Sequence, residues 1–306
     1  MSNSASNPAL ISSVPELEDF LSSILPSDTI YVDLEGNRLS RHGTISLVTL
    51  LIHPSIVVRI IDILALGSTA FTTPSKSGKS LKSMLEDSSI PKCIWDVRND
   101  ADALWALYRV SIAGVTDIQL LENASRPSDK TYVRGLDKCV QHDLKLGFME
   151  LNRWIRTKKE VQGLMPYGVF TARPLDAKII QYCANDVTYL PGLHTFYVNR
   201  IKGDWLTKAI EESAKRVVEA QSPTYDPQAP SKKVGPWGLG GEMRRTTMDE
   251  MLDELDNQRM DAMARDMFGD ADEVGYYEYD DDGGGTNAAD GAFCPEAFDS
   301  CWDRNS

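Results

Sequence analysis

The chain has 306 residues and a formal net charge of −13, but residues 1–220 carry 25 basic and 25 acidic side chains, so its acidity does not exclude a nucleic-acid ligand. No run of eighteen apolar residues occurs and the N-terminus lacks a basic and an apolar region, which argues against a transmembrane helix or a signal peptide. Five cysteines without a CxxC pair argue against a disulfide framework or a zinc site and favour a reducing compartment, the cytoplasm or the nucleus.

The folded elements are predicted from hydrophobic patterning. A helix with Pro15 in its first turn is followed by three segments rich in β-branched residues, 29–35, 43–53 and 55–64, which predict an antiparallel meander. Short helices and strands then alternate up to residue 123, and residues 133–221 are mostly helical in pattern. The order predicts an α/β fold with a mixed sheet, three antiparallel strands before parallel ones, and helices on both faces.

The end of the chain differs in composition. Residues 221–306 carry 7 basic and 20 acidic side chains, begin with a Pro/Gly-rich stretch and include a low-complexity acidic run. Such composition cannot bury enough apolar area to fold alone, although residues 246–268 could form a charged amphipathic helix. We expect a loose N-terminus over 1–12, one domain over 13–221 and a mostly disordered acidic tail over 222–306. The tail could bind a protein partner, keep the chain soluble, or compete with nucleic acid for a basic groove.

Two acids in the first predicted strand are candidates for a metal site. Asp33 and Glu35 alternate with Val32 and Leu34, so both carboxylates project from the same face of an extended strand. Two like charges on one face repel, and a bound cation would remove that cost. Mg²⁺ prefers oxygen ligands of this kind. A solvated sheet face is the alternative interpretation for this pair alone.

Two further positions add acids to this set. Asp100 lies at the start of a predicted helix, where a carboxylate also complements the helix N-terminus and needs no other role. Tyr182 and Asp186 are four residues apart on another predicted helix, a spacing that places them on one face. A partly buried tyrosine beside an exposed aspartate would give the same spacing.

Taken in order, the three motifs resemble those of the ribonuclease D and Werner-type 3′–5′ exonuclease family, the Tyr-containing DEDD group (DEDDy) of the ribonuclease H-like fold. They are VDLEG around Asp33, RNDADAL around Asp100, and ARPLDAKIIQYCANDVTYL around Asp186. The resemblance spans about residues 29–193, and the overall run also looks like the fungal members of the family. Many relatives have histidine five residues before the second-motif aspartate, where this chain has Trp95, which we interpret as a core residue.

The resemblance implies a two-metal phosphodiesterase. Asp33, Glu35 and Asp186 would bind the first Mg²⁺ or Mn²⁺, while Asp33 would also bridge to a second ion held by Asp100. Tyr182 would orient the water that attacks the terminal phosphodiester. The implied substrate is a nucleic acid, most simply the single-stranded 3′ end of RNA or DNA, and the implied product is a nucleoside 5′-monophosphate.

Other residues have less specific interpretations. Arg41 and His42 follow the first motif and could contact the terminal nucleotide or lie in an ordinary polar turn. Asp117 is interpreted as structural support. The basic residues at 153–159 could meet phosphates or form a solvated helix face. The alternative functions are a nucleic-acid-binding pseudo-exonuclease that turns nothing over, and an adaptor whose tail recruits partners.

Overall fold

A computed structural model describes residues 8–238 of the chain. Within this range the strands form one mixed sheet in the order β1-β4-β3-β2-β5-β6. The predicted meander is confirmed, because β2 pairs with β3 and β3 with β4 in antiparallel register. The two later strands are parallel, β5 to β2 and β6 to β5, as expected. The strands are β1 (Ala9–Ile11), β2 (Thr29–Glu35), β3 (Leu47–His53), β4 (Val57–Asp62), β5 (Lys92–Ile94) and β6 (Val115–Asp117).

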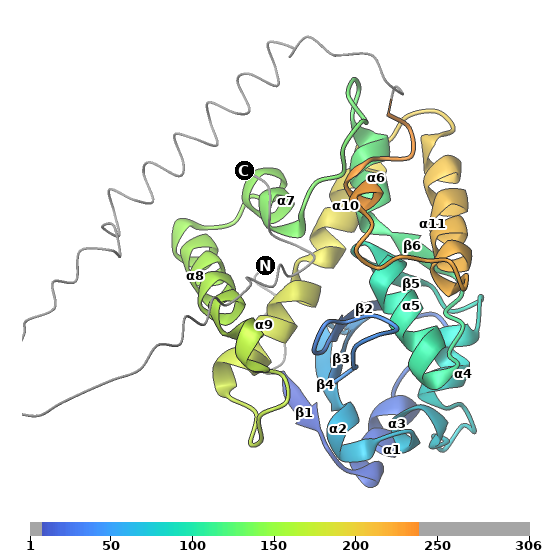
Figure 1. Ribbon diagram of the computed structural model, residues 1–306, viewed down its shortest axis with the longest axis vertical. Helices are drawn as coiled ribbons and strands as arrows, with labels where there is room; N and C mark the ends of the chain where they lie inside the picture. The colour runs from blue at the N-terminus through green and yellow to red at the C-terminus, as the bar shows by residue number, and fades with distance from the viewer. Residues whose placement is uncertain (1–7, 239–306) are drawn as a thin grey trace, which may run out of the picture. The chain divides into compact units, whose positions relative to one another are not determined.

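Helices cover both faces of this sheet (Figure 1). Before β6 the helices are α1 (Val14–Ser22), α2 (Ile63–Leu66), α3 (Thr69–Thr72), α4 (Leu81–Glu86) and α5 (Val97–Tyr108). After β6 they are α6 (Ile118–Ser125), α7 (Leu136–Asp143), α8 (Phe148–Leu164), α9 (Ala177–Thr188), α10 (Leu190–Arg200) and α11 (Trp205–Gln221), with short 3-10 turns at Met165–Tyr167 and Pro230–Lys233. Within the stretch predicted to be mostly helical, residues 177–200 form two helices, and Pro191 lies in the first turn of α10.

The central strand β2 divides the core. Its residues Ile30, Val32 and Leu34 pack with apolar side chains of α1, α4 and α5 in one cluster. Tyr31, on the opposite face, packs in a second cluster with side chains of α6, α9 and α10. Because strand side chains alternate between faces, Asp33 and Glu35 point to the same side as Tyr31, toward α9. The apolar face of β2 therefore fixes the direction of its two carboxylates.

The ends of the domain differ from the prediction. Residues 9–11 form strand β1, paired in parallel with β4, although residues 1–12 were expected to be loose. The described structure also continues past 221: Tyr225 and Trp237 pack against the two core clusters, and Val234 forms a β-bridge with Tyr132. Packed residues therefore continue beyond the expected boundary at 221 to the last described residue, 238. The possible helix at 246–268 and the acidic run lie outside the described residues.

Two sequence expectations concern the environment of the chain. No helix between residues 8 and 238 is long and apolar enough to cross a membrane. Cys93, Cys139 and Cys183 are buried free thiols, and Cys294 and Cys301 lie outside the described range.

Candidate active site

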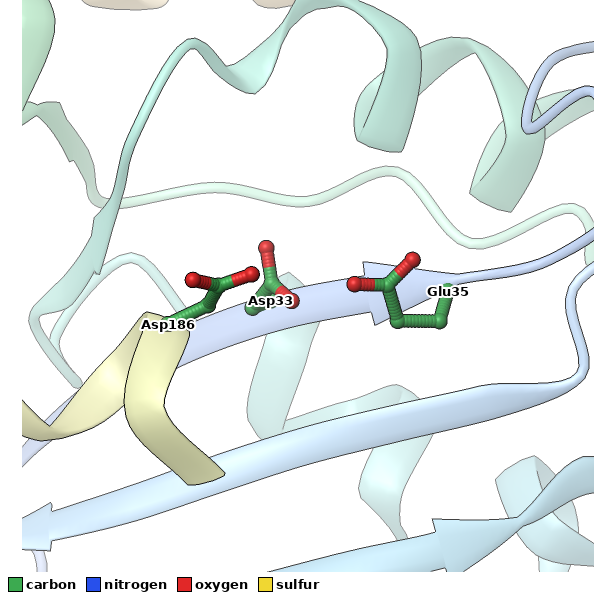
Figure 2. Close-up of side chains that lie close together, drawn as sticks. All are labelled: Asp33, Glu35 and Asp186. Carbon is green, nitrogen blue, oxygen red and sulfur yellow. The ribbon is translucent and has the colours of Figure 1, made fainter. Parts of the chain in front are cut away.

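Three of the predicted acids meet at the end of β2. Figure 2 shows Asp33 and Glu35 projecting from this strand toward Asp186, which comes from α9. One carboxylate oxygen from each of the three lies within 4.8 Å of the other two. Residues 153 positions apart in the chain are thus brought together, and the predicted same-face arrangement of Asp33 and Glu35 is present. We call these three residues the acidic cluster.

Helix α9 brings Tyr182 and Asp186 to the cluster. Both are buried, at 6% exposure each, and they lie one helical turn apart. Burial raises the pKa of the Asp186 carboxyl, and the neighbouring Tyr182 hydroxyl lowers it in part. The helix begins after Asp176, whose carboxylate accepts a hydrogen bond from the Lys178 amide.

The loop before α9 is held by an ion pair. The Arg173 guanidinium donates two hydrogen bonds to the carboxylate of Asp62 at the end of β4, at 2.6 and 2.7 Å. Asp62 is 1% exposed and also accepts hydrogen bonds from the Leu64 and Ala65 amides, which begin α2. The paired arginine therefore fixes the start of α9 against the end of β4.

Asp100 comes from a different helix and stands apart from the acidic cluster. It lies in the first turn of α5, is 3% exposed, and its Oδ1 has no hydrogen-bond partner among the described residues. It is not one of the three acids within 4.8 Å of each other. Its charge nevertheless raises the pKa of Asp33 and of Glu35, so it lies near the cluster.

The start of α5 is built by Asp117, as the structural interpretation predicted. Asp117 is fully buried, and its carboxylate accepts hydrogen bonds from the amides of Asp96 and Val97 at 2.9 and 3.1 Å. Arg216 of α11 neutralises it at 2.7 Å. Trp95 is 4% exposed within the core, which confirms its interpretation as a core residue.

The acids of the cluster and Asp100 lie close enough to repel one another when they are charged. Burial raises the pKa of Asp33 and Glu35 well above the usual range, and the neighbouring acids raise it further. Burial likewise raises the pKa of Asp100. Burial raises the pKa of the Tyr182 phenol, so the hydroxyl keeps its proton and can donate it to an oxygen ligand. Carboxylates in this state favour a cation among them.

One positive charge faces the cluster from α8. Lys158 lies 3.8 Å from the Asp186 Oδ1, with only 13% of its side chain exposed. Its charge lowers the pKa of Asp33, Glu35 and Asp186 against the effect of burial. The sequence places this lysine in a basic stretch but does not single it out from its neighbours. Its position four residues after buried Trp154, on the same face of α8, is the signal that could have identified it.

Arg41 and His42 lie beyond the first motif in different surroundings. The Arg41 Nε and backbone amide donate to the buried carboxylate of Asp102, at 2.6 and 2.7 Å. His42 is exposed. A substrate contact for either residue stays a prediction.

The donor set fits a divalent cation. All the gathered ligands are oxygens, and Asp33 Oδ2, Asp100 Oδ1 and Asp186 Oδ1 are buried without a hydrogen-bond partner in the described structure. Buried polar atoms normally have partners, and hard divalent ions take carboxylate oxygens. The residues present therefore match the predicted Mg²⁺ or Mn²⁺ site in chemistry.

A mixed sheet of three antiparallel strands followed by parallel ones, with acids on its central strand and on a crossing helix, defines a ribonuclease H-like nuclease fold. Residues 8–202 match the family model described as 3′-5′ exonuclease. The chain belongs to this 3′-5′ exonuclease family, in its DEDDy group, as its motifs predicted. No curated protein matches it significantly.

Solved structures share the fold. The Trypanosoma brucei RNase D complex with RNA U12 is 20% identical over 90% of this chain and 92% of that one, with a TM-score of 0.62. The RNase D: GMP complex from the same organism is 21% identical over 75% and 69%, with a TM-score of 0.61. The catalytic core of its RRP6 is 18% identical over 71% and 54%, with a TM-score of 0.54. The similarity to fungal members stays a prediction.

Proposed function

We propose that this chain is a divalent-metal-dependent 3′–5′ exonuclease that releases nucleoside 5′-monophosphates from the end of a nucleic-acid strand. The acidic cluster carries the proposal, because three carboxylates within 4.8 Å are stable together only with protons or a cation among them. Asp33, Glu35 and Asp186 would hold one ion, and Asp33 with Asp100 a second. Bound ions of this kind neutralise the charge that develops on phosphate oxygens and favour hydroxide formation from water.

The chain's own residues would position the reactants. The Tyr182 hydroxyl, one turn from Asp186, would hold the attacking water in line with the terminal phosphorus. Attack of that water breaks the bond between phosphorus and the 3′ oxygen of the penultimate nucleotide. That oxygen leaves as the new 3′ hydroxyl, and the phosphate stays on the released nucleotide. Lys158 would add a fixed positive charge beside the reacting phosphate.

A nucleic-acid substrate is supported by two observations. The family model that matches this chain describes 3′-5′ exonucleases, and the similar RNase D was solved with RNA U12. The test is digestion of matched 5′-labelled RNA and DNA oligonucleotides with Mn²⁺ or Mg²⁺, with the released nucleotide identified by mass spectrometry. We expect a ladder that shortens from the 3′ end and disappears with EDTA or Asp33→Ala, but persists with Glu211→Ala, an exposed acid on α11.

The outcomes separate the candidate functions. A ladder unchanged by Asp33→Ala would mean that the activity does not come from the acidic cluster. Binding of labelled strands without shortening of any substrate would support the pseudo-exonuclease alternative. Nucleoside 3′-monophosphates as products would contradict the proposed bond cleavage.

A further inference from the structure

The chain segment that follows α11 lies against the helix that carries Asp100. We call residues 222–233 the C-terminal segment. The side chain of Asn99, next to Asp100 on α5, accepts two hydrogen bonds from it on one oxygen: from Lys232 Nζ at 2.5 Å and from the Tyr225 hydroxyl at 2.9 Å. Lys232 Nζ also donates to the Pro227 carbonyl at 3.0 Å, which fixes the ammonium from the other side.

Residues on either side of Asn99 and Asp100 contact the same segment. The Arg98 guanidinium donates to the Lys232 carbonyl at 2.9 Å. At the other end of this turn, Asp102 binds Arg41. The Arg41 guanidinium in turn donates to the Ala220 carbonyl in the last turn of α11 at 2.9 Å. It also donates to two carbonyls of the C-terminal segment, Ser222 at 2.7 Å and Pro223 at 3.1 Å.

Asp100 therefore lies in a helical turn that is held at three of its neighbours, residues 98, 99 and 102. Residues 98–102 span little more than one turn of helix, so fixing these neighbours fixes the direction of the side chain between them. Asp100 Oδ1 itself has no hydrogen-bond partner among the described residues, so no direct contact of that oxygen aims it. The contacts at residues 98 and 99 come from beyond residue 202, where the match to the exonuclease family ends, whereas residue 102 is held by Arg41, which itself binds the segment beyond α11.

The two rings and charges of this segment form one packed unit. The Arg41 guanidinium lies over the Tyr225 ring at 5.5 Å, and the Lys232 ammonium lies 5.9 Å from the same ring centre. These two cations near the ring hold the phenol while its hydroxyl donates to Asn99. Loss of either side chain would thus release the same amide oxygen of Asn99.

We propose that Lys232 and Tyr225 are positioning residues for Asp100, acting through Asn99, so that the C-terminal segment completes the half of the metal site that lies outside the acidic cluster. The inference rests on the proposed function. It predicts that the segment controls the second metal ion and leaves the first, held by Asp33, Glu35 and Asp186, unchanged.

The first test measures metal binding directly, by calorimetric titration of the full chain with Mn²⁺. Partners that orient metal ligands typically contribute about 10–100-fold to metal affinity or activity. We expect Lys232→Met and the milder Tyr225→Phe to weaken the second binding step by about tenfold or more. The first step should stay within about twofold of wild type, inside the scatter expected for an unperturbed site. The matched control is Lys233→Met, an exposed neighbour whose backbone carbonyl accepts from the Val133 amide.

The second test asks whether the effect passes through Asn99. Asn99→Ala should weaken the second binding step as Lys232→Met does, and the double variant should be no weaker than either single one. Lys232→Arg, which keeps a charge and donors, should recover part of the affinity. In exonuclease assays the same variants should lower kcat and raise the Mn²⁺ concentration needed for half-maximal rate, with an unchanged KM for the oligonucleotide.

Several results would overturn the inference. Wild-type affinities for both ions in Lys232→Met and Tyr225→Phe would exclude a positioning role, as would additive effects of Asn99→Ala and Lys232→Met. A raised KM with unchanged metal affinity would make Lys232 a substrate contact instead. If the wild-type chain binds two ions and shortens strands, these results refute the inference alone. If it does neither, the proposed function fails as well.

Discussion

Replacing Asp33 by asparagine is expected to stabilise the protein in the absence of metal while abolishing its activity. Burial and the charges of Asp186 and Asp100 raise the pKa of Asp33. The substitution removes that charge with almost no change of shape. If this loss raises stability and abolishes activity, the repulsion at Asp33 destabilises the metal-free protein and the bound ligand offsets it.

The size of the effect follows from the geometry. At the 4.8 Å limit of the cluster, one pair of carboxylates repels by about 3.5 kcal/mol for an effective dielectric constant of about 20. Protonating a carboxyl of ordinary pKa at pH 7.5 costs about 5 kcal/mol. Repulsion cannot destabilise the folded protein by more than this for one acid, because the acid would then take up a proton. A buried amide without a partner costs about 1–3 kcal/mol. The net gain of Asp33→Asn is then about 2 kcal/mol in the free energy of unfolding, or a Tm higher by about 4–8 °C.

The pH dependence has a definite sign. Because the folded-state pKa values of the clustered acids are raised, the folded protein binds more protons than the unfolded one above about pH 4. Its metal-free stability therefore falls as pH rises from the unfolded pKa through the folded pKa. The advantage of Asp33→Asn should be largest near neutral pH and vanish near pH 4, below both pKa values.

The assay is thermal unfolding in EDTA across this pH range, repeated with Mg²⁺ or Mn²⁺. Wild type should gain stability from the ion and the variant should gain much less. Glu211→Gln, on the exposed face of α11, is the control for removing one negative charge. A metal-free Asp33→Asn protein that melts at or below the wild-type temperature at neutral pH would refute the argument that repulsion dominates this cluster.

Three further substitutions test single parts of the site. Tyr182→Phe should lower kcat by roughly 10²–10³-fold, the range for loss of one well-placed donor, while metal still raises the Tm; an undiminished kcat would remove the hydroxyl from the reaction. Lys158→Met should shift the acid limb of the pH–rate profile to higher pH, because this cation lowers the pKa of the clustered acids, whereas exposed Lys159→Met should not. Arg173→Met should lower the free energy of unfolding by about 2 kcal/mol, since it leaves buried Asp62 without its charged partner; denaturant unfolding measures this, and an unchanged midpoint would contradict it.

The strands and the residues of the acidic cluster could be predicted because their signals are local. The alternation of apolar and acidic residues in Val32, Asp33, Leu34 and Glu35 shows which side chains share a face of a strand. The structure has the same arrangement, because these residues do form a strand. The helical spacing of Tyr182 and Asp186 is equally local. The spatial meeting of these two segments came from the resemblance between motifs, since no periodicity links residues that far apart.

The contacts that could not be predicted join distant residues of opposite charge. Arg41 and Asp102 are 61 positions apart, and nothing near either residue in the sequence identifies its partner. The sequence does not distinguish Lys158 from the other basic residues of α8. Only the packing of α8 beside α9 brings it near Asp186. The burial of a charged side chain depends on tertiary packing, which a single sequence does not encode in a readable pattern.

The packing of residues beyond 221 went unpredicted for a related reason. The stretch after α11 is rich in proline and glycine, which is typical of a linker, and its many polar contacts leave no hydrophobic periodicity. Its anchoring depends on single aromatic residues, including Tyr225 and Trp237, the latter in edge contact with Trp205 at 5.3 Å. Isolated aromatics in an otherwise polar stretch were the available signal.

The division of β2 into an apolar and an acidic face links its alignment to activity. A shift of β2 by one residue relative to β3 would turn Asp33 and Glu35 toward the apolar cluster that contains Ile30, Val32 and Leu34. The same shift would turn these aliphatic side chains toward α9. Deleting a single residue inside this strand should consequently be far more harmful than exchanging any one of its side chains. A chain in which β2 is paired in the wrong register would not place Asp33 and Glu35 beside Asp186. Activity would therefore indicate that the sheet has formed in the correct register.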